Sequence, residues 1–555
     1  MFKVSENRQG DMFMNISNLL SSRKQKLFDS KDGWHNVFNR EVLSRIDERP
    51  YSVLYDDKVG RPNAPIRILI GMMILKEGNG WSDLQLFEEC RFNLKIMHAL
   101  GLHNISDDVP VESTYYEFRR LLGAYNEKGE KDLLKETFLK ITTQQVRAHG
   151  VNGDKIRLDS KLINSNIAKG HRLELVVEAT RKYVKGKELD YLQDKLDTEL
   201  YELMKSMQSK STSNITYRLT GIEKKDMLIK IGSLMHILLG YSSGINYKLL
   251  ERIYKEQYEE IKEGSDDKDN GSKEEKVVAP KSPKDISSSS VQSIHDPEAA
   301  YRAKGHGKNK QIVSGFHSNI TESCGSQDDV NLILDVDVVK ANVSEDAFLI
   351  DSVDACQQVI SEAHEGAKSI EEVITDGGYD NIANRKEMLK EKNPTWRVAK
   401  MKGGAHIYRM IYNEQGELEI YNRKTNEQYE VYYSKIAQKY VIKRENGSRR
   451  YLTKEQVDNY IKHQQIENQI SKESHNLRAS VESTIHQTFH RLKKNNKMVY
   501  RGLIKCQWYV LARAFWVNMI RIRDKNIKKA LFFMFLLLGG FMEPHVQNRE
   551  LIRKY

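Results

Sequence analysis

The stretch from Val373 to Asn381, Val-Ile-Thr-Asp-Gly-Gly-Tyr-Asp-Asn, constrains the fold more than any other part of this chain. Val373 and Ile374 are apolar and β-branched, which favours the end of a buried strand. Asp376 follows after Thr375, and the two glycines after it allow the backbone to turn sharply. An acid would then stand at the carboxyl end of a strand, where open α/β sheets place their sites. Because Asp-Gly-Gly is also a common turn, the motif needs support from the rest of the chain.

Length and composition limit the class of protein. The chain has 555 residues, enough for roughly two or three domains. Its net charge of +11 and its pI near 9.0 favour a polyanionic partner such as nucleic acid, with a generic basic protein as the alternative. The cysteines are Cys90, Cys324, Cys356 and Cys506. They are far apart and form no CxxC pair, which argues against a zinc ribbon or a disulfide framework and predicts a reducing cytoplasm.

Targeting and membrane signals are weak. The residues after Met1 contain no apolar segment of the kind found in signal peptides, so none is expected. The most apolar run, Ala530 to Leu538, is shorter than the roughly 18–20 residues that a membrane span needs. We therefore interpret this run as a buried helix or a packing tail, with contact to a membrane surface as the alternative.

Changes in hydrophobic periodicity divide the chain into segments. An N-terminal segment, residues 1–60, is followed by a domain with helical spacing over residues 61–150. That domain carries Arg67, Arg91, Arg119 and Arg120, so it could bind DNA or serve as a scaffold. Two insertions and a linker are then expected, followed by C-terminal core helices and a tail: a helical insertion at 169–263, a flexible serine-rich linker at 264–293, a β-rich insertion at 401–470, helices at 471–525 and a tail at 526–555.

The remaining residues, 151–168 and 294–400, predict a mixed α/β core. The sequence alternates from Lys155 up to Asp159, as in a half-buried strand, and an acid in that position could be a plain turn former. Further elements are expected downstream: antiparallel strands at 312–320 and 330–339, a helix at 344–364, the strand before Asp376, a helix from 383 and a strand at 396–399.

A third acid, Glu482, lies in the helical region that starts near residue 471. Arg478 and Glu482 fall on one side of that helix by their spacing of four residues. Basic residues with interleaved aromatic residues follow, among them Lys493, Lys494 and Arg501. This mixture can hold a nucleic-acid backbone and stack bases, although a solvated basic face is the plainer interpretation.

The three acids suggest metal-dependent chemistry. Asp159, Asp376 and Glu482 come from separate elements that could converge at one edge of the sheet. Three adjacent carboxylates repel one another unless a cation neutralises them, and hard oxygen ligands suit Mg²⁺ or Mn²⁺. Two such ions about 4 Å apart activate a water or a 3′-hydroxyl and stabilise the leaving oxygen. The pattern therefore predicts phosphoryl transfer on a nucleic-acid backbone.

These motifs resemble those of bacterial insertion-sequence transposases of the DDE type, which have an RNase H-like catalytic core. This resemblance covers nearly the whole chain beyond residue 50, apart from the linker. The matching stretches are Val59-Gly60-Arg61-Pro62 through Ser113-Thr114-x-x-x-Phe118-Arg119 for the N-terminal domain, Leu158-Asp159-Ser160, Asp296-Pro297-Glu298-Ala299, Ser314-Gly315-Phe316, Thr375 through Asn381, Arg478-x-x-x-Glu482, Lys493-Lys494 and Tyr500-Arg501-Gly502-Leu503.

The chain departs from the pattern of some relatives at two positions. His475 stands where some relatives have Tyr, and Phe489 stands where some have Lys, so Lys493 or Lys494 would have to supply that basic group. Some relatives also carry paired cysteines in the β-rich insertion. Residues 401–470 contain none, so zinc is not expected there.

The resemblance implies a fold, a site and partners. The fold would be an RNase H-like mixed sheet flanked by helices. Asp159, Asp376 and Glu482 would be the catalytic residues and would bind two Mg²⁺ or Mn²⁺ ions, while the basic residues would hold DNA phosphates: Arg478, Lys493, Lys494 and Arg501. The partners would be the terminal repeats of the element and target DNA, bound by a homodimer in the bacterial cytoplasm near the nucleoid, with no membrane. The alternatives are a catalytically inactive DNA-binding relative and another RNase H-like nuclease.

Overall fold

The computed structural model describes most of the chain. The described residues are 1–5, 14–56, 59–129, 131–168, 170–241, 243–244, 246–262, 276–305, 307, 310–325, 329–390, 393–398, 407–444, 447–468 and 472–537. Within them, the side chains of residues 262, 276–277, 466–468, 472–480 and 531–537 are not described.

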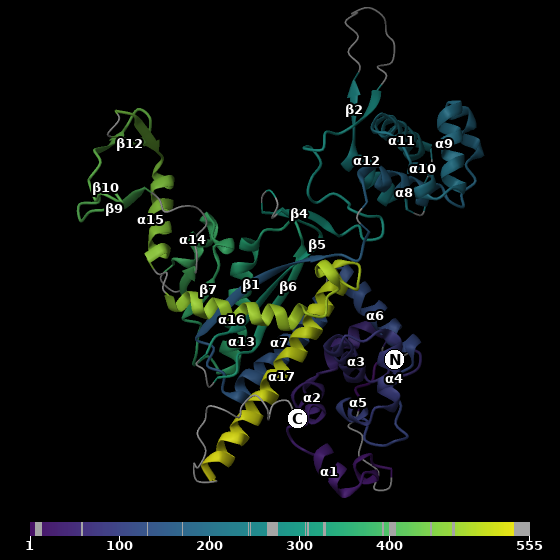
Figure 1. Cartoon of the computed structure of the whole chain (residues 1–555), viewed down its shortest axis with the longest axis vertical. Coiled ribbons are helices and arrows are strands. Elements are labelled where there is room, and N and C mark those ends of the chain that lie inside the picture. The colour runs from purple at the N-terminus through teal and green to yellow at the C-terminus, as the bar shows by residue number, and fades with distance from the viewer. Residues whose placement is uncertain are drawn as a thin grey trace, which may run out of the picture.

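A mixed β-sheet with helices on both faces forms the centre of the molecule (Figure 1). The strands lie in the order β4-β5-β1-β7-β8, and β6 also pairs with β5. β5 runs antiparallel to β1, β4 and β6, whereas β1, β7 and β8 run parallel. The predicted fold class is confirmed, and its order of elements agrees with the expected core. The strands are β1 (Lys155–Asn164), β4 (Ala300–Lys304), β5 (Gln311–Ser323), β6 (Ile333–Lys340), β7 (Glu372–Thr375) and β8 (Thr395–Val398).

Alternation along the strands assigns each face of the sheet to different helices. Ile156, Leu158 and Val373 join an apolar cluster with α13 (Leu349–Ala363). Successive residues of a strand point to opposite faces, so Arg157 and Ile374 lie on the other side. That side is crossed by α16 (Lys472–Phe489), which packs on β1 and β7, while α17 (Leu503–Leu537) packs on β6. A short helix, α14 (Ile382–Met388), connects β7 to β8.

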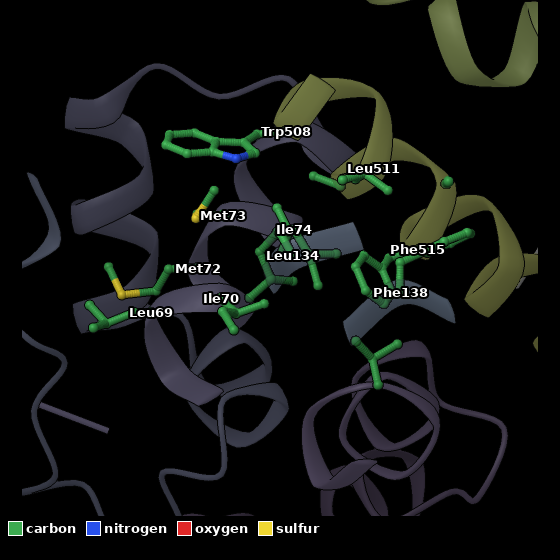
Figure 2. Close-up of a cluster of buried hydrophobic side chains, with 14 of the residues drawn as sticks. Leu69, Ile70, Met72, Met73, Ile74, Leu134, Phe138, Trp508, Leu511 and Phe515 are labelled. Carbon is green, nitrogen blue, oxygen red and sulfur yellow. The ribbon is translucent and has the colours of Figure 1, made fainter. Parts of the chain in front are cut away.

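Seven helices among the described residues precede the sheet and share one core with α17. Figure 2 shows part of this core, where Ile74 and Leu134 lie near Phe138 and Phe515. The N-terminal segment packs into the same core, because Val37 and Phe38 are fully buried there. The helices are α1 (Ser22–Phe28), α2 (Trp34–Glu41), α3 (Ile66–Asn79), α4 (Asp83–Phe92), α5 (Leu94–Ala99), α6 (Glu112–Glu127) and α7 (Leu133–His149).

Two insertions extend from the carboxyl ends of parallel strands. The helical insertion follows β1, and the β-rich insertion follows β8 and leads into α16. Figure 1 shows both rising from the same edge of the sheet. The first contains α8 (Arg172–Val184), α9 (Thr198–Ser209), α10 (Thr212–Thr216), α11 (Gly221–Tyr241), α12 (Tyr247–Gln257), β2 (Tyr258–Lys262) and β3 (Lys276–Pro280). The second contains β9 (Tyr408–Tyr412), β10 (Leu418–Asn422), β11 (Val431–Ser434), β12 (Lys439–Lys443), β13 (Arg449–Leu452) and α15 (Lys454–Asn468).

The expected flexible linker, residues 264–293, is partly a structured segment. Residues 276–280 form β3, which pairs antiparallel with β2. Val291 and the neighbouring Ile294 are buried in the core of the helical insertion. The prediction of a flexible linker, which rested on the serine-rich composition, is therefore wrong for residues 276–293. Strand pairing and a few buried apolar side chains order them. Residues 264–275 lie outside the described residues.

Helix α17 passes through the expected boundary between core helices and tail at residue 525/526. It continues without interruption to Leu537, so the beginning of the apolar run belongs to this helix. Within the described residues, no helix combines the length and apolarity that crossing a bilayer requires. Residues 538–555 lie outside the described part of the chain.

A buried arginine joins three helices where two of them end. Arg513 of α17, 1% exposed, donates to the carbonyl oxygens of Glu77 and Gly78 in α3 at 3.1 and 2.8 Å. It also donates to the carbonyl oxygens of Gln487 and Thr488 in α16. The last carbonyls of a helix lack partners within it, so this guanidinium satisfies groups that would otherwise be buried without hydrogen bonds.

A lysine from α7 approaches two acids on β6. Lys135 contacts Asp337 and lies 3.2 Å from Asp335, which is fully buried. One ammonium can balance only one of these carboxylates. Burial, followed by the charge of Asp337, therefore raises the pKa of Asp335 to about 7.

This raised pKa predicts a pH-dependent stability. Between the ordinary pKa of 3.8 and about 7, the unfolded chain loses the Asp335 proton while the folded chain keeps it. Rising pH in that window therefore destabilises the native protein relative to an Asp335→Asn variant, and the difference levels off above pH 7. Urea unfolding of both proteins at several pH values measures it. A constant difference across the window would contradict the assignment.

Candidate active site

Asp159 and Asp376 lie next to each other at the centre of the sheet. Arg157 of β1 pairs with Ile374 of β7 in a parallel ladder, so the next same-face positions are Asp159 and Asp376. Asp376 directly follows β7 and keeps an extended backbone, with φ −86° and ψ 175°. Neighbouring strands are about 4.8 Å apart, which brings the two half-buried acids together on the face that α16 covers.

Asp159 differs from its expected position in one respect. The sequence predicted it at the end of a strand, but β1 continues to Asn164 because β5 pairs with it along that whole length. Asp159 therefore projects from the middle of a strand, where it is paired with Ile320 of β5. Its carboxylate accepts a hydrogen bond from the N–H of Ser160 at 2.8 Å.

The turn after Asp376 is held in a fixed shape. The Oδ1 of Asp376 accepts from the N–H of Gly378 at 2.7 Å and caps a single 3₁₀ turn, η7 (Gly377–Tyr379). A Cβ at Gly378 would overlap the Oε2 of Glu345 and approach Oδ1 of Asp376, so the close approach of Glu345 requires glycine here. The second glycine of the motif thus has a steric cause.

Glu345 is a buried acid beside this turn. Burial alone would raise its pKa, but a hydrogen bond from Lys304 at 2.8 Å and the charge of that lysine lower the pKa below its ordinary value. Glu345 is therefore a carboxylate at neutral pH. Sequence reasoning missed Glu345, because it begins a short 3₁₀ segment, η6 (Glu345–Phe348), with no motif of its own.

Tyr379 anchors the turn to the sheet. This fully buried side chain donates to Oδ1 of Asn319 on β5 at 2.5 Å, and Asn319 donates to Ser352 of α13 at 2.9 Å. Burial, followed by the nearby charges of Asp159 and Asp376, raises the pKa of Tyr379 well above its ordinary value. The tyrosine therefore stays protonated and remains a hydrogen-bond donor.

A buried histidine of β5, His317, lies on the opposite face of the sheet from Asp159. His317 contacts Oγ of Ser160 through Nε2 and the carbonyl of Val343 through Nδ1, both at 2.9 Å. Burial lowers its pKa to about 4, so the ring is neutral. A carbonyl only accepts, hence Nδ1 carries the proton and Nε2 accepts from Ser160. His317 is thus a structural group under the site.

A buried charge network holds α16 above the two acids. Glu322 of β5 is fully buried and accepts from Arg157 at 2.6 Å, from Thr484 of α16 at 2.7 Å and from Arg521 of α17 at 2.7 Å. Arg521 also donates to Thr484. Four elements therefore meet at one carboxylate.

Glu482, the third predicted acid, lies two residues before Thr484 on the same helix. Its side chain is exposed, in contrast to the buried Thr484. The structure thus brings Asp159 and Asp376 together and places Glu482 on the helix that crosses their strands. Among the described residues, no three His, Cys, Asp or Glu side chains are grouped so that they could hold a metal ion.

The acid pair itself fits a hard cation. Mg²⁺ prefers carboxylate oxygens and is typically held by one or two carboxylates together with phosphate oxygens of a substrate. Asp159 and Asp376 supply that number of carboxylates from rigid neighbouring elements. The chemistry of the donor set therefore suits a magnesium or manganese ion.

The predicted basic residues lie near the end of β1. Lys493 and Lys494 are exposed. The loop that carries them forms a β-bridge between its Lys497 and Asn164 of β1. Arg501 is exposed, but its Nε donates to the carbonyl of Asn166 at 2.8 Å, which gives it a structural contact that the sequence did not suggest. Arg478 lies in α16, one turn before Glu482, and its side chain is outside the described part.

The motif around Asp296 has a structural role. Asp296 accepts from Ser165 and from the N–H of Gly502 at 3.1 Å, while Glu298 accepts from the N–H of Leu503 at 2.9 Å. Gly502 directly precedes α17 and Leu503 is its first residue, and the first N–H groups of a helix have no partner inside it. Two acids at a helix N-terminus also match its dipole. The motif therefore caps α17 and fixes it to the strand that bears Asp159.

The arginines of the N-terminal domain make internal contacts. Arg67 lies beside Glu48, and exposed ion pairs join Arg91 to Glu112 and Arg120 to Glu117. Arg119 stacks over the rings of Tyr115 and Tyr500. The sequence predicts either DNA contact or a scaffold role for these arginines. Their recorded contacts lie within the chain, and DNA contact stays a prediction.

The comparisons with known proteins bear on this N-terminal region. Residues 27–121 match the model of a transposase domain (DUF772). This range contains α2 to α5 and the first part of α6, and it stops before the sheet. A search of the curated proteins gave no match, and a search of the solved structures gave none either. The family match supports a transposase, a class of protein that cuts and transfers DNA.

The Glu322 network gives a testable consequence for stability. Replacing Glu322 with Gln leaves Arg157 and Arg521 without their buried counter-charge, which typically costs about 3–5 kcal/mol of unfolding free energy. Urea unfolding of Glu322→Gln is expected to show this loss. Glu455→Gln is the matched control, since Glu455 is an exposed glutamate of α15 outside the network and its replacement should leave the unfolding midpoint unchanged. Equal midpoints for wild type and Glu322→Gln would contradict the role of the network.

Proposed function

We propose that this chain is a DDE transposase that cleaves DNA at the ends of an insertion sequence and transfers the strands to target DNA. The single observation that supports this most is the register of β1 and β7, which brings Asp159 and Asp376 together on one face. The matched transposase domain at residues 27–121 supports the same class independently of the acids.

Three side chains would hold two Mg²⁺ or Mn²⁺ ions: Asp159, Asp376 and Glu482. When bound, such ions activate a water or 3′-hydroxyl and stabilise the charge that develops on the leaving oxygen. The chain itself would keep the acids rigid. The Tyr379 hydrogen bond fixes the turn of Asp376, and the Glu322 network fixes the helix of Glu482.

Basic groups would hold the DNA backbone beside the acids. Lys493 and Lys494 are exposed in a loop attached to β1, five residues beyond Asp159 at Asn164. Arg478 and Arg501 are proposed for the same purpose, Arg501 through donors other than its Nε. The partners would be the terminal repeats of the element and the target DNA. Two ends must be cut together during transposition, which favours a homodimer.

The proposal predicts that Asp376→Asn abolishes cleavage. The substitution removes a negative charge but keeps the shape, so it weakens cation binding while the fold is retained. Labelled DNA that carries the flanking element ends is incubated with the wild type and the variant in Mg²⁺. Cleavage is expected to fall by at least about 1000-fold, in line with loss of a group that acts at the reacting centre, while DNA binding persists.

Controls separate the proposal from its rivals. Asp285→Asn changes an exposed acid in the segment between β3 and β4 and should cut like the wild type. Equal cleavage by Asp376→Asn would remove this acid from the site. Binding without cleavage by the wild type would favour an inactive DNA-binding relative. Cleavage without joining of a 3′-hydroxyl end to target DNA would favour another RNase H-like nuclease.

A further inference from the structure

The β-rich insertion contains a three-stranded sheet with two unlike faces. β12 lies between β11 and β13 in antiparallel pairs. One face carries Tyr440, Ile442 and Leu452, which join an apolar cluster with β9, β10 and α15. That face is the core side of the insertion. The opposite face, formed by the alternate residues, has no part in this cluster.

The outer face carries a row of two exposed tyrosines. Tyr432 of β11, Val441 of β12 and Tyr451 of β13 are directly opposite one another in the ladders. Val441 is 1% exposed, whereas Tyr432 and Tyr451 are 41% and 49% exposed. The rings therefore shield the valine and still present large aromatic surface to solvent. Each of the two strands beside Val441 supplies one of these tyrosines, so the exposed rings lie on both sides of the valine.

Positive charge surrounds these rings. Lys443 and Arg449 face each other in the next row of the outer face, and Lys439 lies in the row on the other side. Lys443 sits 5.8 Å from the ring centroid of Tyr432 and also pairs with Glu430 at 2.5 Å. Lys439 and Arg449 are exposed. Aromatic rings flanked by cations match the two halves of a nucleotide, the base and the phosphate.

The position of the face relates it to the acids. The insertion begins after β8, which runs parallel to β7 and β1, so it leaves the sheet at the edge where Asp376 stands. It returns through α15 to α16, the helix that carries Glu482. DNA bound at the acids would therefore lie at the edge from which this insertion rises (Figure 1).

We propose that the outer face of β11–β13 binds single-stranded DNA, with Tyr432 and Tyr451 stacking on unpaired bases and Lys439 and Arg449 contacting phosphates. Unpaired bases are the specific partner of exposed aromatic rings, because the faces of paired bases are covered by their neighbours in a duplex. The inference takes DNA as the substrate from the proposed function, but it concerns binding and requires no cleavage.

Fluorescence anisotropy of the full chain in EDTA tests the proposal without any cleavage. The probes are a labelled single strand of about 20 nucleotides, long enough for a typical single-strand site, and the duplex of the same sequence. Replacing both Tyr432 and Tyr451 with Ala should weaken single-strand binding by at least about 10-fold, whereas the double Phe variant keeps the rings and should bind like the wild type. Duplex binding should change much less.

Matched variants complete the test. Tyr217→Ala removes a ring that is 67% exposed on the helical insertion and should leave binding unchanged. Lys439→Ala with Arg449→Ala should reduce the slope of log affinity against log salt by about 1 to 1.5, as expected for two phosphate contacts on a single strand. Circular dichroism verifies that each variant is folded.

Three results would overturn the proposal. Unchanged single-strand binding by the double Ala variant would exclude stacking on this face. An equal loss of duplex and single-strand binding would show that the face does not select unpaired bases. A change of oligomeric mass in light scattering, with single-strand binding intact, would make the face a protein interface. None of these outcomes depends on whether Asp376 is catalytic, since the binding assay includes no metal.

Discussion

The carboxylate of Glu322 is the point on which the site depends. It lies fully buried on β5 and receives hydrogen bonds from β1, α16 and α17. A buried charge is costly unless it is paired and fully hydrogen-bonded, so the three donors cannot move apart independently. Arg157, its partner on β1, is two residues before Asp159, and Thr484 is two residues after Glu482. The network therefore fixes the strand and the helix that carry two of the three acids.

The N-terminal domain and the central sheet are joined through α17. Arg513 of this helix satisfies carbonyls at the ends of α3 and α16, and Lys135 of α7 reaches the acids of β6. Acids of the Asp296 motif cap the start of the same helix. The region that matches a transposase domain is thereby joined to the sheet and to α16 by contacts of α17.

Local sequence was sufficient to predict the strands of the sheet and the two aspartates, because β-branched runs and a glycine turn leave few alternatives at Asp376. It was insufficient to predict features that depend on contacts between residues distant in the chain. The extension of β1 past Asp159 depends on pairing with β5, and the order in residues 276–293 depends on β2 and on buried Val291. The capping by Asp296 depends on Gly502, more than 200 residues away. Metal binding and the roles of the basic residues remain predictions.

Iron-directed cleavage of the polypeptide would show whether Asp159 and Asp376 hold a divalent cation. Fe²⁺ takes the place of Mg²⁺, and with ascorbate and peroxide it generates hydroxyl radicals that cut the nearby backbone. Cuts are expected close to residues 159 and 376 in the DNA-bound protein, suppressed by excess Mg²⁺ and absent from Asp159→Asn. Cuts confined to other segments, or unaffected by that substitution, would contradict cation binding by this pair.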